Sequence, residues 1–214
     1  MRRLPVYLLL DCSGSMTGEP IEAVRQGVRA LVSDLRGDPM ALENAYLSVI
    51  TFASSAQQLS PLTEIASFQE PTLTASGTTA LGEALKLLEQ CIDNEVQKST
   101  QQQKGDWKPL VFLMTDGQPT DSWESAADRI KSKRPGNLVA CAAGPGADSN
   151  MLKRITENVV ELRSLQPEQL RAFFKWVSSS IKNASQKVDA PATDPNAGFT
   201  PPPPPQNSGI NIVL

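Results

Sequence analysis

The chain has 214 residues, of which 40% are hydrophobic. This length fits one domain of about 150–200 residues with a remainder, and the hydrophobic fraction excludes a wholly disordered chain. The 20 Lys and Arg residues against 23 Asp and Glu give a net charge of −3 without a basic block, which argues against nucleic acid as the main partner.

The side-chain inventory excludes several kinds of catalytic and metal site. The sequence contains no histidine, so it can form neither a Ser-His-Asp nor a Cys-His catalytic group, nor a zinc site with His ligands. Its three cysteines, Cys12, Cys91 and Cys141, are far apart and include no Cys-x-x-Cys pair. This pattern suits a reducing compartment rather than a disulfide framework.

The first predicted element is an apolar run over residues 4–10. Met1-Arg2-Arg3 precede it, as in a signal peptide, but the run contains Pro5 and ends at Asp11 without a small-residue cleavage site. We therefore interpret the run as a buried strand. No segment approaches the length of a transmembrane helix, and we expect a cytoplasmic protein that makes no membrane contact.

The next elements alternate between helix and strand. Apolar residues recur at helical spacing over 21–35, and Gly37 stands where such a helix would end. Residues 46–53 predict a second strand, and residues 56–62 a third, antiparallel strand after a tight turn. A further helix is predicted from residue 80 to about residue 98.

The strand predicted over residues 109–115 is apolar on both faces, as expected of a central parallel strand. The alternation continues with predicted helices over 122–132, 149–156 and 167–183 and strands over 137–143 and 158–162. This order predicts an α/β fold, in which a doubly wound, mostly parallel sheet has helices on both faces.

The composition changes near the C-terminus. Residues 189–214 hold seven of the 17 prolines, five of them consecutive at 201–205, and no Lys or Arg. Such a segment favours an extended, polyproline-like chain that cannot pack a core. We therefore divide the chain into a domain over 1–185 and a flexible, Pro-rich tail over 186–214. The last five residues are apolar and β-prone, and either dock as a peptide or fray.

Three segments carry oxygen-bearing side chains at the predicted ends of elements. Residues 11–15 (Asp-Cys-Ser-Gly-Ser) follow the first strand, residues 76–82 (Ser-Gly-Thr-Thr-Ala-Leu-Gly) precede a helix, and residues 115–117 (Thr-Asp-Gly) end the most apolar strand. In open α/β sheets, ligands bind at the carboxyl ends of the strands. We therefore expect these three segments to meet at one edge of the sheet.

The residue types in these segments indicate a cation site. Carboxylates and hydroxyls are hard oxygen donors, which suit Mg²⁺, Mn²⁺ or Ca²⁺ rather than zinc. Ser13 and Ser15 stand two and four positions after Asp11, so a tight loop that turns at Gly14 can gather their side chains around one point. A divalent cation held by two carboxylates and neutral hydroxyls keeps Lewis acidity toward a further carboxylate.

These motifs together resemble the metal-ion-dependent adhesion site of von Willebrand factor A (integrin I-like) domains. The resemblance rests on Asp11-x-Ser13-x-Ser15, on a threonine before Ala-Leu-Gly-Glu-Ala-Leu, and on the Thr-Asp-Gly segment, and it covers roughly residues 3–183. Within that family the chain is similar to the bacterial tellurium-resistance TerY-like proteins. This finer likeness rests on residues 79–85, on residues 114–121 (Met-Thr-Asp-Gly-Gln-Pro-Thr-Asp) and on the proline-rich end.

The resemblance implies a Rossmann-like, six-stranded and mostly parallel sheet, together with a set of metal ligands. The ligands that it implies are Asp11, Ser13, Ser15, Thr79 and Asp116. The two serines would coordinate directly, the threonine would contribute its hydroxyl, and the aspartates would bind directly or through water. The family usually has Gly-Gly-Thr where this chain has Gly77-Thr78-Thr79, and the spacing to Gly82 favours Thr79 over Thr78.

The resemblance also implies a function. We expect a non-enzymatic module in which bound Mg²⁺ (or Mn²⁺, with Ca²⁺ less favoured) is completed by an Asp or Glu of a protein partner. The TerY likeness implies tellurite and chemical-stress resistance alongside a protein kinase and a PP2C-like phosphatase, with Thr193 and Thr200 as candidate phosphorylation sites. Two alternatives stay open: a metal-assisted hydrolase, which lacks a plausible general base, and a regulatory subunit with an empty metal site.

Four residues near these motifs have plainer interpretations. Asp121 and Glu124 follow the third segment, and we interpret them as the acids that favour the start of the helix over 122–132 rather than as groups that orient metal ligands. Cys12 is expected to be a small buried side chain. Trp107 either caps the sheet edge or belongs to an exposed contact surface.

Overall fold

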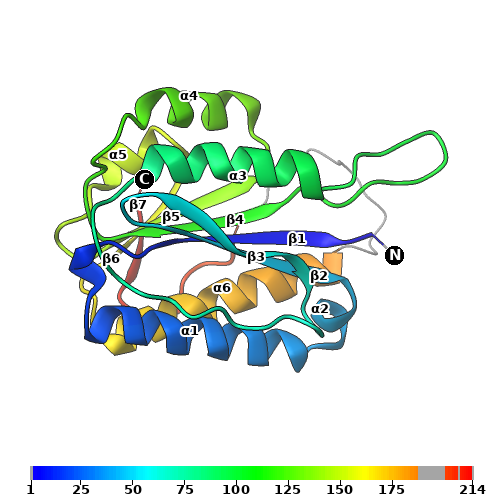
Figure 1. The fold of residues 1–214 in the computed structure, drawn as a ribbon. Coiled ribbons are helices and arrows are strands. Elements are labelled where there is room, and N and C mark those ends of the chain that lie inside the picture. Colours follow the sequence, from blue (N-terminus) through cyan, green and yellow to red (C-terminus); the bar gives the residue numbers. More distant parts are fainter. Residues whose placement is uncertain (1, 188–200, 207, 214) are drawn as a thin grey trace.

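The computed structural model contains one seven-stranded sheet with helices on both faces (Figure 1). It describes residues 2–187, 201–206 and 208–213. The strands are β1 (Leu4–Asp11), β2 (Ala45–Phe52), β3 (Ala56–Glu64), β4 (Leu110–Thr115), β5 (Asn137–Ala143), β6 (Asn158–Leu162) and β7 (Ile210–Val213). The helices are the 3-10 turn η1 (Gly14–Met16) and α1 (Glu19–Arg36), α2 (Pro39–Asn44), α3 (Leu81–Glu95), α4 (Glu124–Lys133), α5 (Ser149–Lys153) and α6 (Pro167–Lys187).

The order of the strands places a switch in winding direction at the middle of the sheet. The order is β3-β2-β1-β4-β5-β6-β7, so the chain moves from β1 to one side through β2 and later returns to the other side through β4. Strands β1, β2, β4, β5 and β6 are parallel, whereas β3 and β7 run antiparallel at the two edges. This confirms the predicted doubly wound α/β fold, and it leaves a ligand position between the carboxyl ends of β1 and β4.

The helices cover the two faces because the central strands are apolar on both. Val6, Leu8 and Leu10 of β1 belong to one buried cluster with α1 and α6, while Tyr7 and Leu9 belong to the other with α3, α4 and α5. Such two-sided burial is typical of parallel strands between helix layers. The alternation of side chains along β1 therefore divides the core into two layers on either side of the sheet.

The sheet has seven strands, and the prediction of six was wrong. The additional strand, β7, comes from the segment that we assigned to a flexible tail, and Ile210 in it is buried. Strand β6 offers an edge whose backbone groups β7 can pair with, and the indole N–H of Trp176 on α6 donates to the Pro202 carbonyl at 2.8 Å. Pro202 in the proline run thus has a hydrogen-bond partner that composition alone does not indicate. Thr193 and Thr200 lie outside the described residues.

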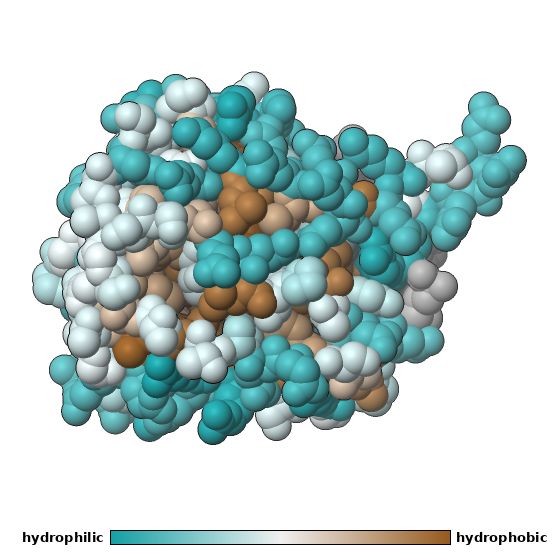
Figure 2. Space-filling view, viewed as in Figure 1, coloured by the Kyte–Doolittle hydropathy of each residue, from teal (hydrophilic) through white to brown (hydrophobic). Residues whose placement is uncertain are grey.

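The other edge of the sheet is only half covered. Strand β3 consists of exposed and partly buried residues around the buried Ser60, and Leu59 and Leu62 pack against the two buried clusters. Figure 2 shows apolar surface at the centre of this side, within a hydrophilic rim. Pro61 removes one backbone donor from the strand, which discourages pairing with another chain.

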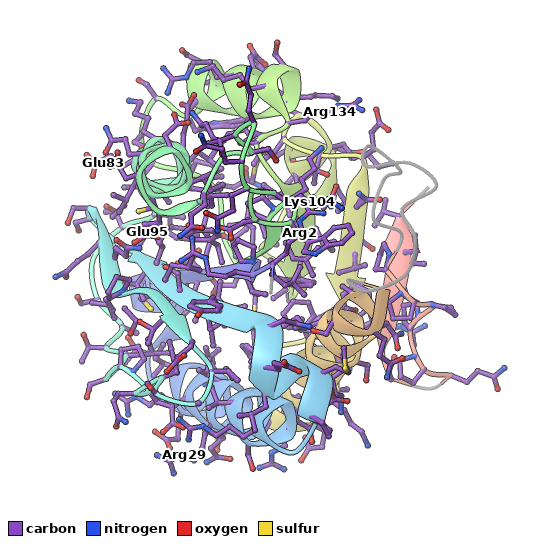
Figure 3. The ribbon with its side chains drawn as sticks, turned by 90° about the vertical axis from the view of Figure 1, so that its right-hand side faces the viewer. Arg2, Arg29, Glu83, Glu95, Lys104 and Arg134 are labelled. Atoms are coloured by element: carbon purple, nitrogen blue, oxygen red, sulfur yellow. The ribbon has the colours of Figure 1, made fainter. Side chains whose placement is uncertain are left out.

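The end of the sheet opposite the candidate site is closed by polar contacts. The Tyr7 hydroxyl donates to Glu95 Oε2 at 2.9 Å at the end of α3, and Arg3 pairs with Asp106 at 2.5 Å (Figure 3 labels Glu95 on α3). Arg2 stacks over Trp107 at 4.1 Å, so this partly buried indole packs at the amino end of the central strands β1 and β4. In the described parts of the chain, the helices are too short or too polar to cross a membrane.

Candidate metal centre

The first segment of the site is a tight turn at the end of β1. Asp11 is fully buried, and its Oδ1 accepts the Ser13 backbone N–H at 2.8 Å, which turns the chain back over the strand end. The Ser13 and Ser15 hydroxyl oxygens are 3.0 Å apart, with Ser13 buried and Ser15 exposed. The carboxylate and both hydroxyls therefore gather on one side of this turn, as their spacing predicted.

The third segment lies beside the first because β4 is hydrogen-bonded to β1. Ser15 donates its hydroxyl hydrogen to Asp116 Oδ1 at 2.9 Å, and Thr115 donates to Asp11 Oδ2 at 2.6 Å. Asp116 is 6% exposed, although it stands at a strand end. Two buried carboxylates from segments 105 positions apart thus share one polar network.

The second segment, residues 76–79, lies against the first turn. The Gly14 N–H donates to the Gly77 carbonyl at 3.0 Å, and a Cβ at Gly14 would lie 3.2 Å from the same oxygen. Thr79 is buried, and its hydroxyl oxygen lies 3.8 Å from the Cβ position of Gly117. Thr78 is exposed, and its N–H and hydroxyl donate to Ser54 Oγ. Of the two threonines, the fold thus brings Thr79 beside the Asp116 loop.

The two carboxylates form no ion pair within the part of the chain that the structure describes. In the described residues, neither Asp11 nor Asp116 pairs with a Lys or Arg. Burial raises the pKa of Asp116 above its ordinary value, the charge of Asp11 raises it further, and the hydrogen bond from Ser15 opposes the change. A cation would remove this cost of holding a negative charge out of water.

The donor set defines which cation fits. The gathered atoms are carboxylate and hydroxyl oxygens, and the described residues contain no cluster of three or more His, Cys, Asp or Glu side chains. Hard cations such as Mg²⁺ and Mn²⁺ prefer such oxygen ligands. The neighbouring thiol of Cys12 is buried, and burial followed by the charge of Asp11 raises its pKa to about 12, so it remains protonated.

Two residues in the loop that follows Asp116, Thr120 and Asp121, have a role that the sequence did not reveal. Asp121, which we interpreted as an acid for the following helix, instead accepts the N–H groups of Gly82 and Glu83 at the start of α3, at 3.0 and 2.9 Å. Thr120 and Thr79 exchange hydrogen bonds of 3.0 and 2.9 Å. Both contacts join residues about 40 positions apart, and no local pattern signals them.

Comparisons with known proteins find a matching domain family and structures of the same fold. The model of the von Willebrand factor type A domain matches residues 6–175. The uncharacterised protein sll0103 of Synechocystis is 37% identical over 125 residues, which cover 55% of this chain and 26% of that protein. The chain therefore spans only about a quarter of the length of this relative.

Two solved structures share the fold at low identity. Proximal thread matrix protein 1 from the mussel byssus, with zinc in its metal-ion-dependent adhesion site (MIDAS) motif, is 20% identical with a TM-score of 0.59, covering 86% of this chain and 46% of its own. Manganese-loaded TRAP protein of Plasmodium vivax is 22% identical with a TM-score of 0.54, covering 75% of this chain and 68% of its own.

Proposed function

Because the chain belongs to the von Willebrand factor type A family, we propose that it is a non-enzymatic module that binds a protein partner through a divalent cation. One observation carries the proposal: two buried carboxylates at neighbouring strand ends, Asp11 and Asp116, each accept a hydroxyl hydrogen bond, and neither has a basic partner among the described residues. Domains of this family are typically interaction modules rather than enzymes.

The proposed ligands divide into charged and neutral donors. Asp11 and Asp116 provide the two negative charges, and Ser13, Ser15 and Thr79 provide neutral hydroxyls. When bound, the cation supplies a Lewis-acidic position that accepts a carboxylate from outside. Zinc and manganese occur in the mussel and Plasmodium structures, but the all-oxygen set here favours Mg²⁺ or Mn²⁺ over zinc.

The residues around the site favour binding over hydrolysis. Metal-assisted hydrolysis benefits from a general base beside the metal-bound water. The chain has no histidine, and Asp121, the nearest further carboxylate in the Asp116 loop, already accepts two backbone N–H groups of α3. The incoming group that fits this chemistry is therefore an Asp or Glu side chain of a partner.

We further propose a biological setting from the sequence likeness. Residues 79–85 and 114–121 and the proline-rich end are similar to the bacterial TerY-like proteins of tellurite resistance. The proposed setting is cytoplasmic, beside a protein kinase and a PP2C-like phosphatase. Comparing tellurite survival of cells that carry the wild-type gene or an Asp116→Ala gene, at equal protein levels, tests this setting.

The binding proposal is tested with peptides that differ only in charge. Immobilised peptides with one central Glu or Asp are compared with peptides that carry Gln or Asn, in Mg²⁺ and in EDTA. We expect binding of the wild-type chain only when a carboxylate and the metal are both present, and no binding of Asp116→Ala. Equal binding to the Gln and Glu peptides would refute recognition of a carboxylate.

A further inference from the structure

The loop that begins with Asp116 also controls the position of the second predicted segment. We infer that Thr120 and Asp121 are positioning residues that hold the Thr79 hydroxyl at a set place relative to Asp116. The inference rests on the proposed metal-binding function, since it concerns two of the proposed ligands. One loop thus supplies one ligand and places another.

Thr120 forms hydrogen bonds with both the backbone N–H and the carbonyl of Thr79. The Thr79 N–H donates to Thr120 Oγ1 at 3.0 Å, and the Thr120 N–H donates to the Thr79 carbonyl at 2.9 Å. Two hydrogen bonds between the same two residues restrict rotation as well as translation of the Thr79 backbone. Since a threonine side chain is stiff at χ1, the direction of its hydroxyl follows from the direction of its backbone.

Asp121 holds the start of α3, which directly follows Thr79. Its Oδ1 accepts the Gly82 N–H at 3.0 Å and its Oδ2 the Glu83 N–H at 2.9 Å. The N-cap residue of α3 is Ala80, which has no side chain that could cap the helix. The first turn therefore depends on a carboxylate from another loop, which also faces the positive end of the helix (Glu83 is labelled in Figure 3).

The close approach of α3 to the Asp121 loop requires a glycine at position 82. A Cβ at Gly82 would lie 2.7 Å from the Ser122 carbonyl oxygen and 2.7 Å from the Trp123 Cα. Such distances are too short for a side chain, so Gly82 allows the backbone of α3 to approach the loop directly. The loop over residues 116–123 and the segment over residues 79–83 therefore pack directly against each other.

Loss of the hydrogen bonds from Thr120 and Asp121 should make Thr79 more mobile without unfolding the chain. The Ala80 N–H also donates to the Ala53 carbonyl at 2.7 Å, which ties the segment to the end of β2 independently of Thr120. Partners that orient metal ligands typically change metal affinity by about 10–100-fold when they are removed. We expect the lower end of this range, about tenfold, because one tether remains.

The variants separate positioning from ligation. Thr120→Val removes the acceptor for the Thr79 N–H, Thr120→Ser retains it, and Asp121→Asn weakens the contact with α3. Matched controls lie at the opposite end of the sheet, near the amino ends of its strands: Thr156→Val removes a 2.8 Å bond to the Leu138 carbonyl, and Asp38→Asn alters the cap of α2. All are tested in the full chain.

Mn²⁺ affinity is measured by calorimetry, and amide hydrogen exchange at Thr79, Gly82 and Glu83 is measured without metal. We expect about tenfold weaker Mn²⁺ binding and faster exchange in Thr120→Val and Asp121→Asn, near wild-type values in Thr120→Ser, and unchanged Mn²⁺ binding in both controls. Unchanged Mn²⁺ affinity in Thr120→Val would refute the positioning role but leave the proposed metal function standing. Complete loss of binding in Asp121→Asn, as in Asp116→Ala, would instead identify Asp121 as a ligand. A wild-type chain that binds no Mn²⁺ would refute the metal function itself.

Discussion

The substitution Asp116→Asn should make the metal-free protein more stable and the metal-bound protein less stable than the wild type. Burial and the nearby charge of Asp11 raise the pKa of Asp116 in the folded chain. The folded state therefore holds a proton at this site more tightly than the unfolded state does. The protonated Asp116 side chain therefore stabilises the fold at low pH, and this stabilisation is lost as the pH rises through the pKa of Asp116 in the folded chain. At neutral pH the ionised side chain destabilises the metal-free fold.

An asparagine removes this charge while keeping the local contact. Its Oδ1 can still accept the Ser15 hydroxyl, which lies 2.9 Å from the present carboxylate. The metal-free variant should thus unfold at a higher temperature than the wild type at pH 7, and the difference should shrink as the pH falls and vanish below about 4, the ordinary pKa of an aspartate. Asp128→Asn is the control of opposite sign, because Arg154 lowers the pKa of the exposed Asp128.

The metal reverses the order of the two proteins. A cation at a hundred times its dissociation constant stabilises the wild type by about 2.7 kcal/mol, which raises the melting temperature by roughly 5–10 °C for a domain of this size. The variant should show little of this shift. Thermal unfolding followed by circular dichroism, in EDTA and in Mg²⁺, measures both effects. A metal-free variant that melts below the wild type, or one with the full Mg²⁺ shift, would refute the electrostatic reasoning.

Three further results are expected. Gly82→Ala should lower the free energy of unfolding in urea by about 1–3 kcal/mol, because its Cβ would meet loop backbone at 2.7 Å; Gly37→Ala, with 3.6 Å to its nearest atom, should change it by less than about 0.5 kcal/mol, and equal effects would contradict the clash. Ile210→Ala should cost about 2 kcal/mol because the Ile210 side chain of β7 is buried, whereas substitution of Ile212, which is 51% exposed, by Ala should cost less than about 0.5 kcal/mol; no loss of stability in Ile210→Ala would show that the strand does not dock. Alkylation of Cys12 by iodoacetamide at pH 8 should be slow in the native chain and fast in urea, because its pKa is raised to about 12, and rapid native labelling would disprove its burial.

The parts of the site that could be predicted are those encoded by short spacing. The turn from Asp11 to Ser15 depends on neighbouring residues, and the structure gathers these side chains as expected. The apolar run over 109–115 likewise predicted β4, which forms over Leu110–Thr115 beside β1. In both cases the local pattern and the tertiary arrangement favour the same structure.

The parts that could not be predicted depend on contacts between distant residues. Asp121 caps α3 from about 40 positions away along the chain. An acid shortly before a helix usually stabilises the start of that next helix, so the sequence favours α4 and not α3 as its partner. The pairing of β7 with β6 joins residues about 50 positions apart across a proline run that normally indicates an extended tail. The edge of β6, the Trp176 side chain and the buried cluster around Ile210 mark where that segment binds.

The central claim is that the gathered carboxylates and hydroxyls bind a divalent cation. Calorimetric titration of Mg²⁺ into the wild type and into Asp11→Ala tests this claim most directly, with circular dichroism to confirm that the variant is folded. We predict one saturable site per wild-type chain and no binding to the folded variant. Equal binding to both proteins, or no binding to either, would contradict the claim.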